Sequence, residues 1–422
     1  MEEYLLDARG VHTCRFWRGV AMVAVATTTL LVIGFGAGVA TMWAFGPELR
    51  HLVAPALPGA AGTLHEPSGQ ERLSLLTEIW TILDREFYDP DALDDEKMTQ
   101  GAAAGLVRSV GDPHTVYVEP LQAAIMDQEM QGSFEGIGVS VEMIEGRLVI
   151  VKPLPNSPAV EAGLRAGDTI LAVDDEPLEG KSILEVVALI KGPRGTVVRL
   201  LVQREGTPEP FVVPVTRDKV EFPIIESRML EGDIAYLRLK EFNAISQKRV
   251  RSALRELLAD DPAGLVLDLR ENPGGLLNMA VDIASEFLPE GTLILTEEQR
   301  DRAPMEYRVE RGGIATSIPL VVLVNGGSAS AAEIVAAAIR DSDRGILIGE
   351  QTFGKSAVQS THKLSEGSSL RVTIAKWYPP SRKNLDAGGI EPDIQVVLSE
   401  EDLAMEKDGQ LERAVAHLLN GE

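Results

Sequence analysis

The sequence predicts an α/β protein with an N-terminal transmembrane helix, a small helical subdomain, an inserted β-rich domain and an α/β catalytic core. Three observations support this prediction. No charged residue occurs in 19–47. Short strand patterns separated by glycine turns fill 134–216. From residue 234 onward, apolar runs alternate with helical patterns, which is typical of a parallel sheet covered by helices.

The composition excludes several classes of function. The chain has 422 residues, enough for two or three domains, and its 40 basic and 64 acidic residues give a formal net charge of −24. This acidic excess argues against nucleic-acid binding. The single cysteine, Cys14, cannot form an internal disulfide or a cysteine-built metal site, and the six histidines lack metal-ligand spacing. We therefore expect no metal and no other cofactor.

The uncharged stretch 19–47 predicts a membrane anchor. As a helix rising 1.5 Å per residue, 20–45 would be roughly 39 Å long, enough to cross a bilayer. Its apolar part is long for a cleaved signal peptide, although secretion after cleavage remains the alternative. Arg9, Arg15 and Arg18 precede it, which predicts a cytoplasmic N-terminus (1–18) and an extracytoplasmic catalytic part. A flexible linker, rich in Pro, Gly and Ala, follows at 48–70.

Helical spacing predicts a small helical subdomain at 71–132. Apolar residues recur on one helical face, and Pro90 ends that helix. They are Leu73, Leu76, Ile79, Trp80 and Leu83. A second helix, about Asp95 to Ser109, stops at Gly111-Asp-Pro113, and we interpret His114 as a packing or turn residue.

The β-rich unit is predicted at 133–216. Ser182 and Glu185 form a capping box that opens a helix, for which we expect Leu184, Val187 and Ile190 to face inward. The loop Gly136-Ile137-Gly138-Val139 precedes a strand, and its glycines permit a turn that exposes backbone N–H groups.

The core, predicted at 217–398, contains the candidate nucleophile. An apolar strand, Pro319 to Asn325, is followed by glycines, and Ser330 then opens an alanine-rich helix, Ala331 to Arg340. Free N–H groups at a helix N-terminus favour a developing negative charge. Lys355 lies in a predicted loop with apolar neighbours, where desolvation would let it accept a proton, and Gln359 could orient its amine.

The remaining core elements follow from the same patterns. They are strands at 234–239, 264–270, 345–348 and 369–376, and helices at 246–258 and 276–287. A last amphipathic helix at 401–419, within 399–422, is expected to pack on the body or against another subunit, which would make a homo-oligomer.

Four separate motifs resemble the carboxyl-terminal processing peptidases, the S41 family of tail-specific serine proteases with a Ser/Lys dyad. They are Asp268-Leu-Arg-Glu-Asn-Pro-Gly-Gly275, Asn325-Gly-Gly-Ser-Ala-Ser-Ala-Ala-Glu333, Phe353-Gly-Lys355 with Gln359, and Gly389-Ile-Glu-Pro-Asp393. The order of elements in 133–216 also resembles a PDZ domain. The resemblance implies a core of the crotonase and Clp-protease type.

The resemblance also implies roles for individual residues. Ser330 would be the nucleophile, Lys355 the base and Gln359 its orienting partner. Gly275 and Ala331 would form the oxyanion hole. The loop Gly136 to Val139 would bind the C-terminus of a protein or peptide substrate with an apolar tail, by adding it to a sheet edge.

Three other functions remained open from the residues alone. The first is a non-catalytic adaptor that collects chain ends. The second is acyl-CoA chemistry, since crotonase-type enzymes use a similar strand, glycine-rich turn and helix. The third is a Ser-His hydrolase that uses His362, although the geometry expected near Gln359 would expose that histidine.

Overall fold

The computed structural model describes residues 69–386, 388–398, 405 and 407–421. The chain divides into two compact units, Met1–Ala92 and Leu93–Glu422. In the first unit, α3 (Gly69–Glu86) covers the predicted apolar spacing, and the short helix η1 (Pro90–Ala92) follows it. No helix among the described residues is long and apolar enough to span a bilayer. The predicted anchor at 19–47 lies outside the described residues.

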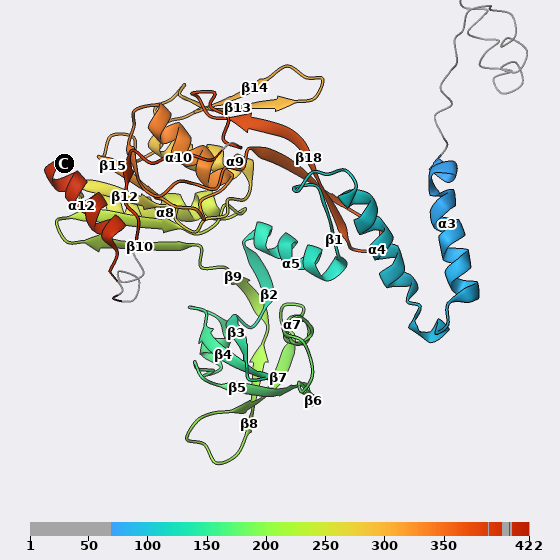
Figure 1. Cartoon of the computed structure of the whole chain (residues 1–422). Helices are drawn as coiled ribbons and strands as arrows, with labels where there is room; N and C mark the ends of the chain where they lie inside the picture. Colours follow the sequence, from blue (N-terminus) through green and yellow to red (C-terminus); the bar gives the residue numbers. More distant parts are fainter. Residues whose placement is uncertain (1–68, 387, 399–404, 406, 422) are drawn as a thin grey trace, which may run out of the picture. The chain divides into compact units, whose positions relative to one another are not determined.

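The second unit is built around a six-stranded sheet (Figure 1). Its strands, in spatial order, are β10 (Ile225–Leu230), β11 (Ile234–Leu239), β12 (Gly264–Asp268), β15 (Leu320–Val324), β16 (Ile346–Gly349) and β19 (Ile394–Gln395). All neighbours from β11 onward pair in parallel, whereas β10 is antiparallel. Every residue of β12 and β15 is buried, as their continuous apolar runs predict for strands covered on both faces.

Three helices connect these parallel strands. They are α8 (Ser246–Leu258), α9 (Leu277–Phe287) and α10 (Ala331–Asp341). The nine residues Ala331 to Ile339 are all buried, which explains the alanine-rich sequence of α10, because small side chains allow close packing on every face. The α/β class expected from the sequence is confirmed.

A second, antiparallel sheet supplies part of the site. It contains β1 (Val116–Val118), β18 (Ser369–Tyr378), β13 (Leu293–Gln299) and β14 (Met305–Arg308), with β17 (Ala357–Lys363) also paired to β18. The helices α4 (Asp95–Arg108) and α5 (Pro120–Gln131) flank β1 in the chain. The sequence predicted a loop through Gln359, but the structure places Gln359 on β17, opposite Thr373. The register of this pairing therefore fixes the position of Gln359.

The β-rich unit forms a separate six-stranded sheet. Its strands are β3 (Val139–Ile144), β4 (Arg147–Pro153), β5 (Thr169–Val173), β6 (Glu176–Pro177), β7 (Val197–Gln203) and β8 (Phe211–Thr216). Its helices are α6 (Pro158–Glu161) and α7 (Ile183–Ile190). The chain enters by β2 (Ser133–Gly136) and leaves by β9 (Asp218–Glu221), and these two strands pair with each other.

Helix α7 has the predicted capping box, with the Ser182 amide donating to Glu185 at 2.7 Å. The prediction of which α7 residues face the core is partly wrong. Val186 and Ile190 are buried, whereas Leu184 is 46% exposed. Residues 186 and 190 are one turn apart and share a face, and 184 lies about 160° away from 186 around the helix axis.

The C-terminal helix α12 (Gly409–Asn420) begins later than the sequence predicts. Asp408 caps it by accepting from the Leu411 amide at 3.0 Å, which explains the start. Ala414 of α12 is buried in a cluster with Val266 and Val321 of the core sheet. The helix therefore packs on the body of its own chain, the first of the two expected arrangements.

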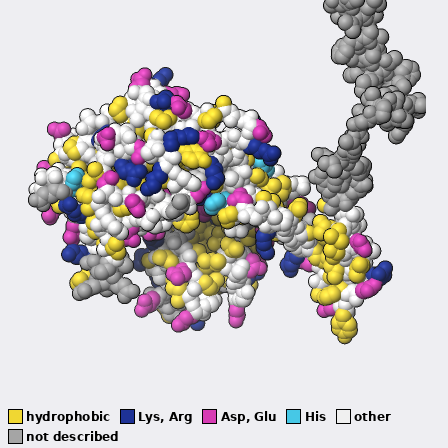
Figure 2. Space-filling view, turned by 45° about the horizontal axis from the view of Figure 1, so that its top comes forward, with side chains coloured by type: hydrophobic (Ala, Val, Ile, Leu, Met, Phe, Trp, Pro, Cys, Tyr) yellow, Lys and Arg dark blue, Asp and Glu magenta, His cyan; other side chains and the backbone are white. Residues whose placement is uncertain are grey.

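In the face shown in Figure 2, acidic and basic side chains are interspersed over the surface.

Candidate active site

The turn between β15 and α10 presents Ser330 in a strained conformation. Ser330 has φ 52° and ψ −113°, outside the regions that non-glycine residues usually occupy. Such strain costs of order 1–3 kcal/mol and persists at functional sites, where the surrounding structure enforces it. Here Ser328 provides the enforcement, since its buried hydroxyl donates to Leu269 O at 2.8 Å and accepts from the Asn325 amide at 3.0 Å.

The second predicted glycine turn lies directly against this serine. The Ala329 amide donates to Asn272 O at 2.9 Å, which joins the two turns. A Cβ on Gly274 would lie 2.8 Å from Ala331 N and 2.9 Å from Ser330 Cβ, so only glycine fits there. Gly275 has φ 142°, and a Cβ on it would lie 2.1 Å from Phe242 O. The structure therefore brings Gly275 and Ala331 to the same place, as the resemblance implied, and adds Gly274.

The amides of Gly275 and Ala331 remain available for a ligand. Within the described part of the chain, neither N–H donates a hydrogen bond to another protein group. Ala331 is buried, and buried backbone donors are nearly always paired, so its unengaged amide indicates a place for an external acceptor, whereas Gly275 is exposed and its amide is open to solvent or a ligand.

Glu333 is a site residue that the sequence analysis missed. Its carboxylate, fully buried on α10, accepts four hydrogen bonds. Oε2 accepts from the backbone amides of Ser330 (2.8 Å) and Lys355 (2.9 Å). Oε1 accepts from the Gly354 amide (2.8 Å) and from the hydroxyl of Thr352 (2.5 Å). A single carboxylate thus ties the backbone of Ser330 to that of Lys355. A glutamate three residues after a helix-opening serine was the available signal.

Lys355 is half-buried, and its charge is disfavoured there. Burial lowers the pKa of Lys355, the Arg371 guanidinium lowers it further, and the Asp112 carboxylate opposes both. The amine donates to Gln359 Oε1 at 3.0 Å. Trp377 Nε1 donates to the Lys355 carbonyl at 3.1 Å and so fixes the backbone. Among the hydrogen bonds of the described residues, none joins the Lys355 amine to the Ser330 hydroxyl.

Gln359 connects the lysine to a turn far away in the sequence. Its Nε2 donates to His114 O, and its Oε1 also accepts from Arg371 Nη2 at 2.8 Å. No sequence pattern pointed to Arg371. The motif Gly111-Asp-Pro-His114, predicted only to end the second helix of the helical subdomain, lies at the site through the His114 carbonyl.

The Asp112 carboxylate organises that turn. It accepts from the Thr115 hydroxyl at 2.5 Å and from the His114 amide at 3.1 Å. Burial favours the neutral acid, but these hydrogen bonds outweigh it and lower the pKa of Asp112 to about 2. His362, in contrast, is exposed on β17, as expected, which removes the geometric basis for a Ser-His hydrolase.

The loop Gly136 to Val139 of the β-rich unit is tightly built. Gly138 has φ 77°, and a Cβ on it would lie 2.4 Å from Ser157 Cβ. The carbonyls of Ile137 and Gly138 accept from the amides of Ala159 and Leu154, both at 2.9 Å. Across the described residues, no protein group accepts from the Ile137 or Gly138 amide. The Ile137 side chain is 1% exposed, so it belongs to the core of this unit and does not form an open pocket wall.

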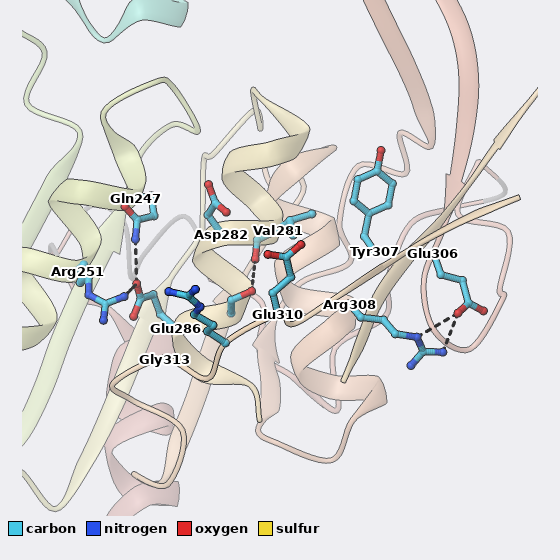
Figure 3. A pocket seen from close by; sticks show the side chains of 12 residues that line it. Gln247, Arg251, Val281, Asp282, Glu286, Glu306, Tyr307, Arg308, Glu310 and Gly313 are labelled. Atoms are coloured by element: carbon cyan, nitrogen blue, oxygen red, sulfur yellow. Dashed lines mark hydrogen bonds and ion pairs between the residues drawn. The ribbon is translucent and has the colours of Figure 1, made fainter. Parts of the chain in front are cut away.

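A cavity of about 460 Å³ lies elsewhere in the second unit, and it contains none of the predicted site residues (Figure 3). Buried Glu286 on α9 borders it, and its Oε1 accepts from Gln247 (3.1 Å) and Arg251 (2.9 Å), as Figure 3 shows. Acidic and basic side chains alternate around the cavity, and we assign it no catalytic role. The described residues contain no group of acids, histidines or cysteines suited to hold a metal ion.

Comparison with protein families defines the class of this protein. The family model described as Peptidase family S41 matches residues 233–396, and the PDZ domain model matches residues 149–204. The fold and these matches together define a serine peptidase with a PDZ domain.

Individual relatives agree with this class. The chain is 37% identical to a carboxy-terminal-processing protease of Bartonella bacilliformis over 307 residues, 72% of this chain and 70% of the relative. It is 34% identical to the carboxy-terminal processing protease CtpA of Bacillus subtilis, over 78% of this chain and 70% of the relative. A solved structure of a candidate S41 protease from Bacteroides fragilis shares the fold, with a TM-score of 0.50, 19% identity, and coverage of 82% of this chain and 97% of that one.

This chain belongs to the carboxy-terminal processing proteases of peptidase family S41. It is therefore an enzyme, a serine-type peptidase, and the adaptor and acyl-CoA alternatives are set aside.

Proposed function

We propose that this chain is a membrane-anchored endopeptidase that cleaves proteins after binding their apolar C-terminal tails, with Ser330 as nucleophile and Lys355 as general base. One observation carries the catalytic part of the proposal. The buried carboxylate of Glu333 accepts from the backbone amides of both Ser330 and Lys355, at 2.8 and 2.9 Å, which supports a site that both residues share.

The chemistry follows from the side chains at that space. The neutral Lys355 amine takes the proton of the Ser330 hydroxyl as the oxygen attacks a substrate carbonyl carbon. The amides of Gly275 and Ala331 donate to the oxyanion, at about 3–4 kcal/mol for each such contact. The tetrahedral intermediate collapses, and the leaving amine takes the proton from Lys355. The same amine then takes a proton from a water molecule whose oxygen attacks the acyl-enzyme carbonyl, and it returns that proton to the Ser330 oxygen as the ester bond breaks.

Gln359 holds the lysine between turnovers. The Lys355 amine donates to Gln359 Oε1 at 3.0 Å, and we propose that the lysine side chain rotates toward Ser330 when substrate binds. Catalytic hydrogen bonds are often long in free enzymes and tighten when substrate binds. Because the reactive form of Lys355 is uncharged, we expect kcat/KM to rise with pH through the lowered pKa of this lysine.

The PDZ domain is proposed to select the substrate. The unengaged amides of Ile137 and Gly138 support this, because a chain-terminal carboxylate is bound by such backbone donors. Gly136 and Val139 flank them at the ends of β2 and β3, and Val139 would pair with the incoming tail.

Residues 19–47 are proposed to anchor the enzyme in the membrane, with the peptidase on the extracytoplasmic side. The support is the uncharged stretch and the three arginines that precede it, Arg9, Arg15 and Arg18. Protease accessibility in intact and opened cells tests the orientation. If an added protease digests the catalytic part only when it can enter the cytoplasm, the proposed extracytoplasmic orientation is contradicted.

The catalytic proposal is tested with one substrate protein, prepared with and without its last few residues. We expect the wild-type enzyme to cleave the tailed form faster, Ser330→Ala to cleave neither, and Ser365→Ala, an exposed change outside the proposed site, to cleave as the wild type does. Measurable cleavage by purified Ser330→Ala, or equal cleavage of both substrates by the wild type, would contradict the proposal.

A further inference from the structure

A single oxygen atom in the site accepts hydrogen bonds from two cationic side chains. Gln359 Oε1 lies 3.0 Å from the Lys355 amine and 2.8 Å from Arg371 Nη2. The two nitrogens are therefore at most about 5.8 Å apart, the sum of these distances. An amide oxygen has two lone pairs and can accept from both groups, but like charges at this separation repel, which disfavours the charged form of the lysine.

Arg371 is buried for a residue of its type, and no carboxylate neutralises it. It lies on β18, half-buried, between the partners Val116 of β1 and Thr361 of β17. Among the ion pairs of the described residues, none includes Arg371. A guanidinium keeps its charge in proteins, so its field acts on its neighbours with little screening from water.

We propose that Arg371 is a positioning residue of this peptidase, whose guanidinium fixes the Gln359 side chain and, by repulsion, keeps the neighbouring Lys355 amine in its neutral, proton-accepting form. This inference rests on the proposed role of Lys355 as general base. It gives Arg371 two actions on the lysine, one through the shared amide oxygen and one through space.

The charges that surround Lys355 agree with this role. Asp112, in the turn after α4, faces the lysine and favours its charged form. Glu333 of α10 accepts from the Lys355 backbone amide, and its oxygens are taken by four donors. Arg371 is the cation that opposes the effect of Asp112 on the lysine amine. Burial is the main cause of the lowered pKa of Lys355, and Arg371 is the next.

A merely structural arginine would hold Gln359 without changing how readily Lys355 binds a proton. Two variants separate these roles. Arg371→Met removes the charge and keeps a long side chain, whereas Arg371→Lys keeps the charge and loses the planar donor group. Lys363→Met is the matched control, since it removes the same charge from an exposed position at the far end of the β17 and β18 pair.

The first measurement reports on the lysine alone. Full-length Ser330→Ala protein is labelled briefly with acetic anhydride at a series of pH values, and acetylation of Lys355 is quantified by mass spectrometry. We expect the midpoint of acetylation to move to higher pH in Arg371→Met, to move less in Arg371→Lys, and to stay in place in Lys363→Met. An unmoved midpoint in folded Arg371→Met would overturn the proposal.

The second measurement reports on catalysis. With a quenched fluorescent peptide that has an apolar C-terminal tail, Arg371→Met should lose roughly three- to tenfold in kcat/KM at pH 7, and the loss should narrow as pH rises. Arg371→Lys should retain most of the wild-type kcat/KM. A loss that is equal at every pH, together with an unmoved acetylation midpoint, would mean a structural role and would overturn the proposal.

The two measurements together distinguish this proposal from the one on which it rests. If the acetylation midpoint moves but the pH–rate profile does not, Arg371 acts on the amine and Lys355 is not the base. Circular dichroism monitors folding of each variant. Should Arg371→Met unfold, Arg371→Gln provides a second uncharged side chain, with the same expected and contradicting results.

Discussion

At the scale of single residues, a buried carboxylate joins the backbone of Ser330 to that of Lys355, the two residues proposed to carry out catalysis. Glu333 accepts four hydrogen bonds, two of them from the amides of Ser330 and Lys355. Hydrogen bonds to a charged acceptor are worth about 1.5–3 kcal/mol each, and a buried donor left unpaired costs about 1–3 kcal/mol. The geometry of the site is thus maintained by a residue that need not touch the substrate.

The substitution Glu333→Gln tests this role. One acceptor oxygen becomes an NH₂ group, which cannot accept from the amides it would face. We expect the free energy of unfolding to fall by about 1.5–3 kcal/mol and kcat/KM to fall by at least about tenfold. Urea unfolding and peptide hydrolysis measure the two effects, and Glu290→Gln, at an exposed position, is the control. Full activity in Glu333→Gln would contradict the positioning role.

The half-buried Lys355 should lower the free energy of unfolding, although it is proposed to be needed for hydrolysis. Its pKa is lower in the folded chain than the ordinary value of 10.5. Between those two values the unfolded chain holds a proton that the folded chain has lost, so the free energy of unfolding rises with pH in that window. Below the folded-state pKa the protein carries the full cost of a buried charge.

Lys355→Met should therefore separate the two properties. We expect hydrolysis to fall by at least about a thousandfold. We also expect the rise of the unfolding free energy with pH to become shallower than in the wild type, as urea unfolding between pH 7 and 10 would show. Lys363→Met, exposed on β17, should keep both the activity and the rise. An unchanged pH dependence in Lys355→Met would mean that this lysine does not titrate as proposed.

At the scale of elements, the site depends on a turn and two strands from distant parts of the sequence. The turn around Asp112 lies against β17 through the bond from Gln359 to His114 O. The Thr115 hydroxyl accepts from the Thr373 amide of β18 at 3.1 Å. This turn therefore aligns the strand pair that supports both Gln359 and Arg371.

The stabilising contribution of the Asp112 turn should be lost at low pH. The pKa of Asp112 in the folded chain, about 2, lies below its ordinary value of 3.8. Its contribution to stability is thus complete above that ordinary value and is lost as pH falls toward 2. We expect Asp112→Asn to be less stable than the wild type at pH 6, by thermal unfolding, with the difference shrinking between pH 4 and 2. Asp95→Asn, an exposed change on α4, should show no such convergence.

At the scale of the whole molecule, the PDZ domain is an insertion whose two ends meet. Gly136 and Asp218 are opposite each other in the β2 and β9 pair, and the Phe222 amide donates to Gly132 O at 3.1 Å. Contacts between side chains also cross the junction, such as the bond from Lys191 to Gln128 at 2.7 Å. Because the entry and exit strands form a hairpin-like pair, the core does not need the insertion to close its chain path.

Replacement of residues 137–217 by a two-residue Asn-Gly turn should therefore leave the peptidase core folded. We expect a single cooperative unfolding transition and reaction of Ser330 with a fluorophosphonate reagent. Cleavage should no longer depend on the C-terminal tail of the substrate. Ser330→Ala in the same shortened chain is the control for the labelling. Loss of the core's secondary structure by circular dichroism would show that the insertion is required for folding.

Much of the fold was predictable because its signals are local. The apolar run at 320–324 becomes a strand buried on both faces, and the helix predicted to follow a Ser246 cap ends at Leu258 as expected, although its cap is Ile245 and Ser246 is its first residue. Capping chemistry places the start of α7, and glycine with positive φ marks the turn at Gly275. The inward face of α7 was partly wrong, because Leu184 is apolar yet faces solvent, and helical spacing alone does not show which apolar residues meet the sheet.

The sequence alone therefore determined the four central parallel strands with the helices between them, the peptidase family, and the residues Ser330, Lys355 and Gln359 as candidates, because these depend on local spacing and on contiguous motifs. Only the tertiary structure showed that Glu333 joins two of these residues, that Gln359 lies on a strand, and that Arg371 and the turn at Asp112 belong to the same site. These residues are separated by tens to hundreds of positions, and their contacts depend on strand register and helix packing, which local patterns do not specify.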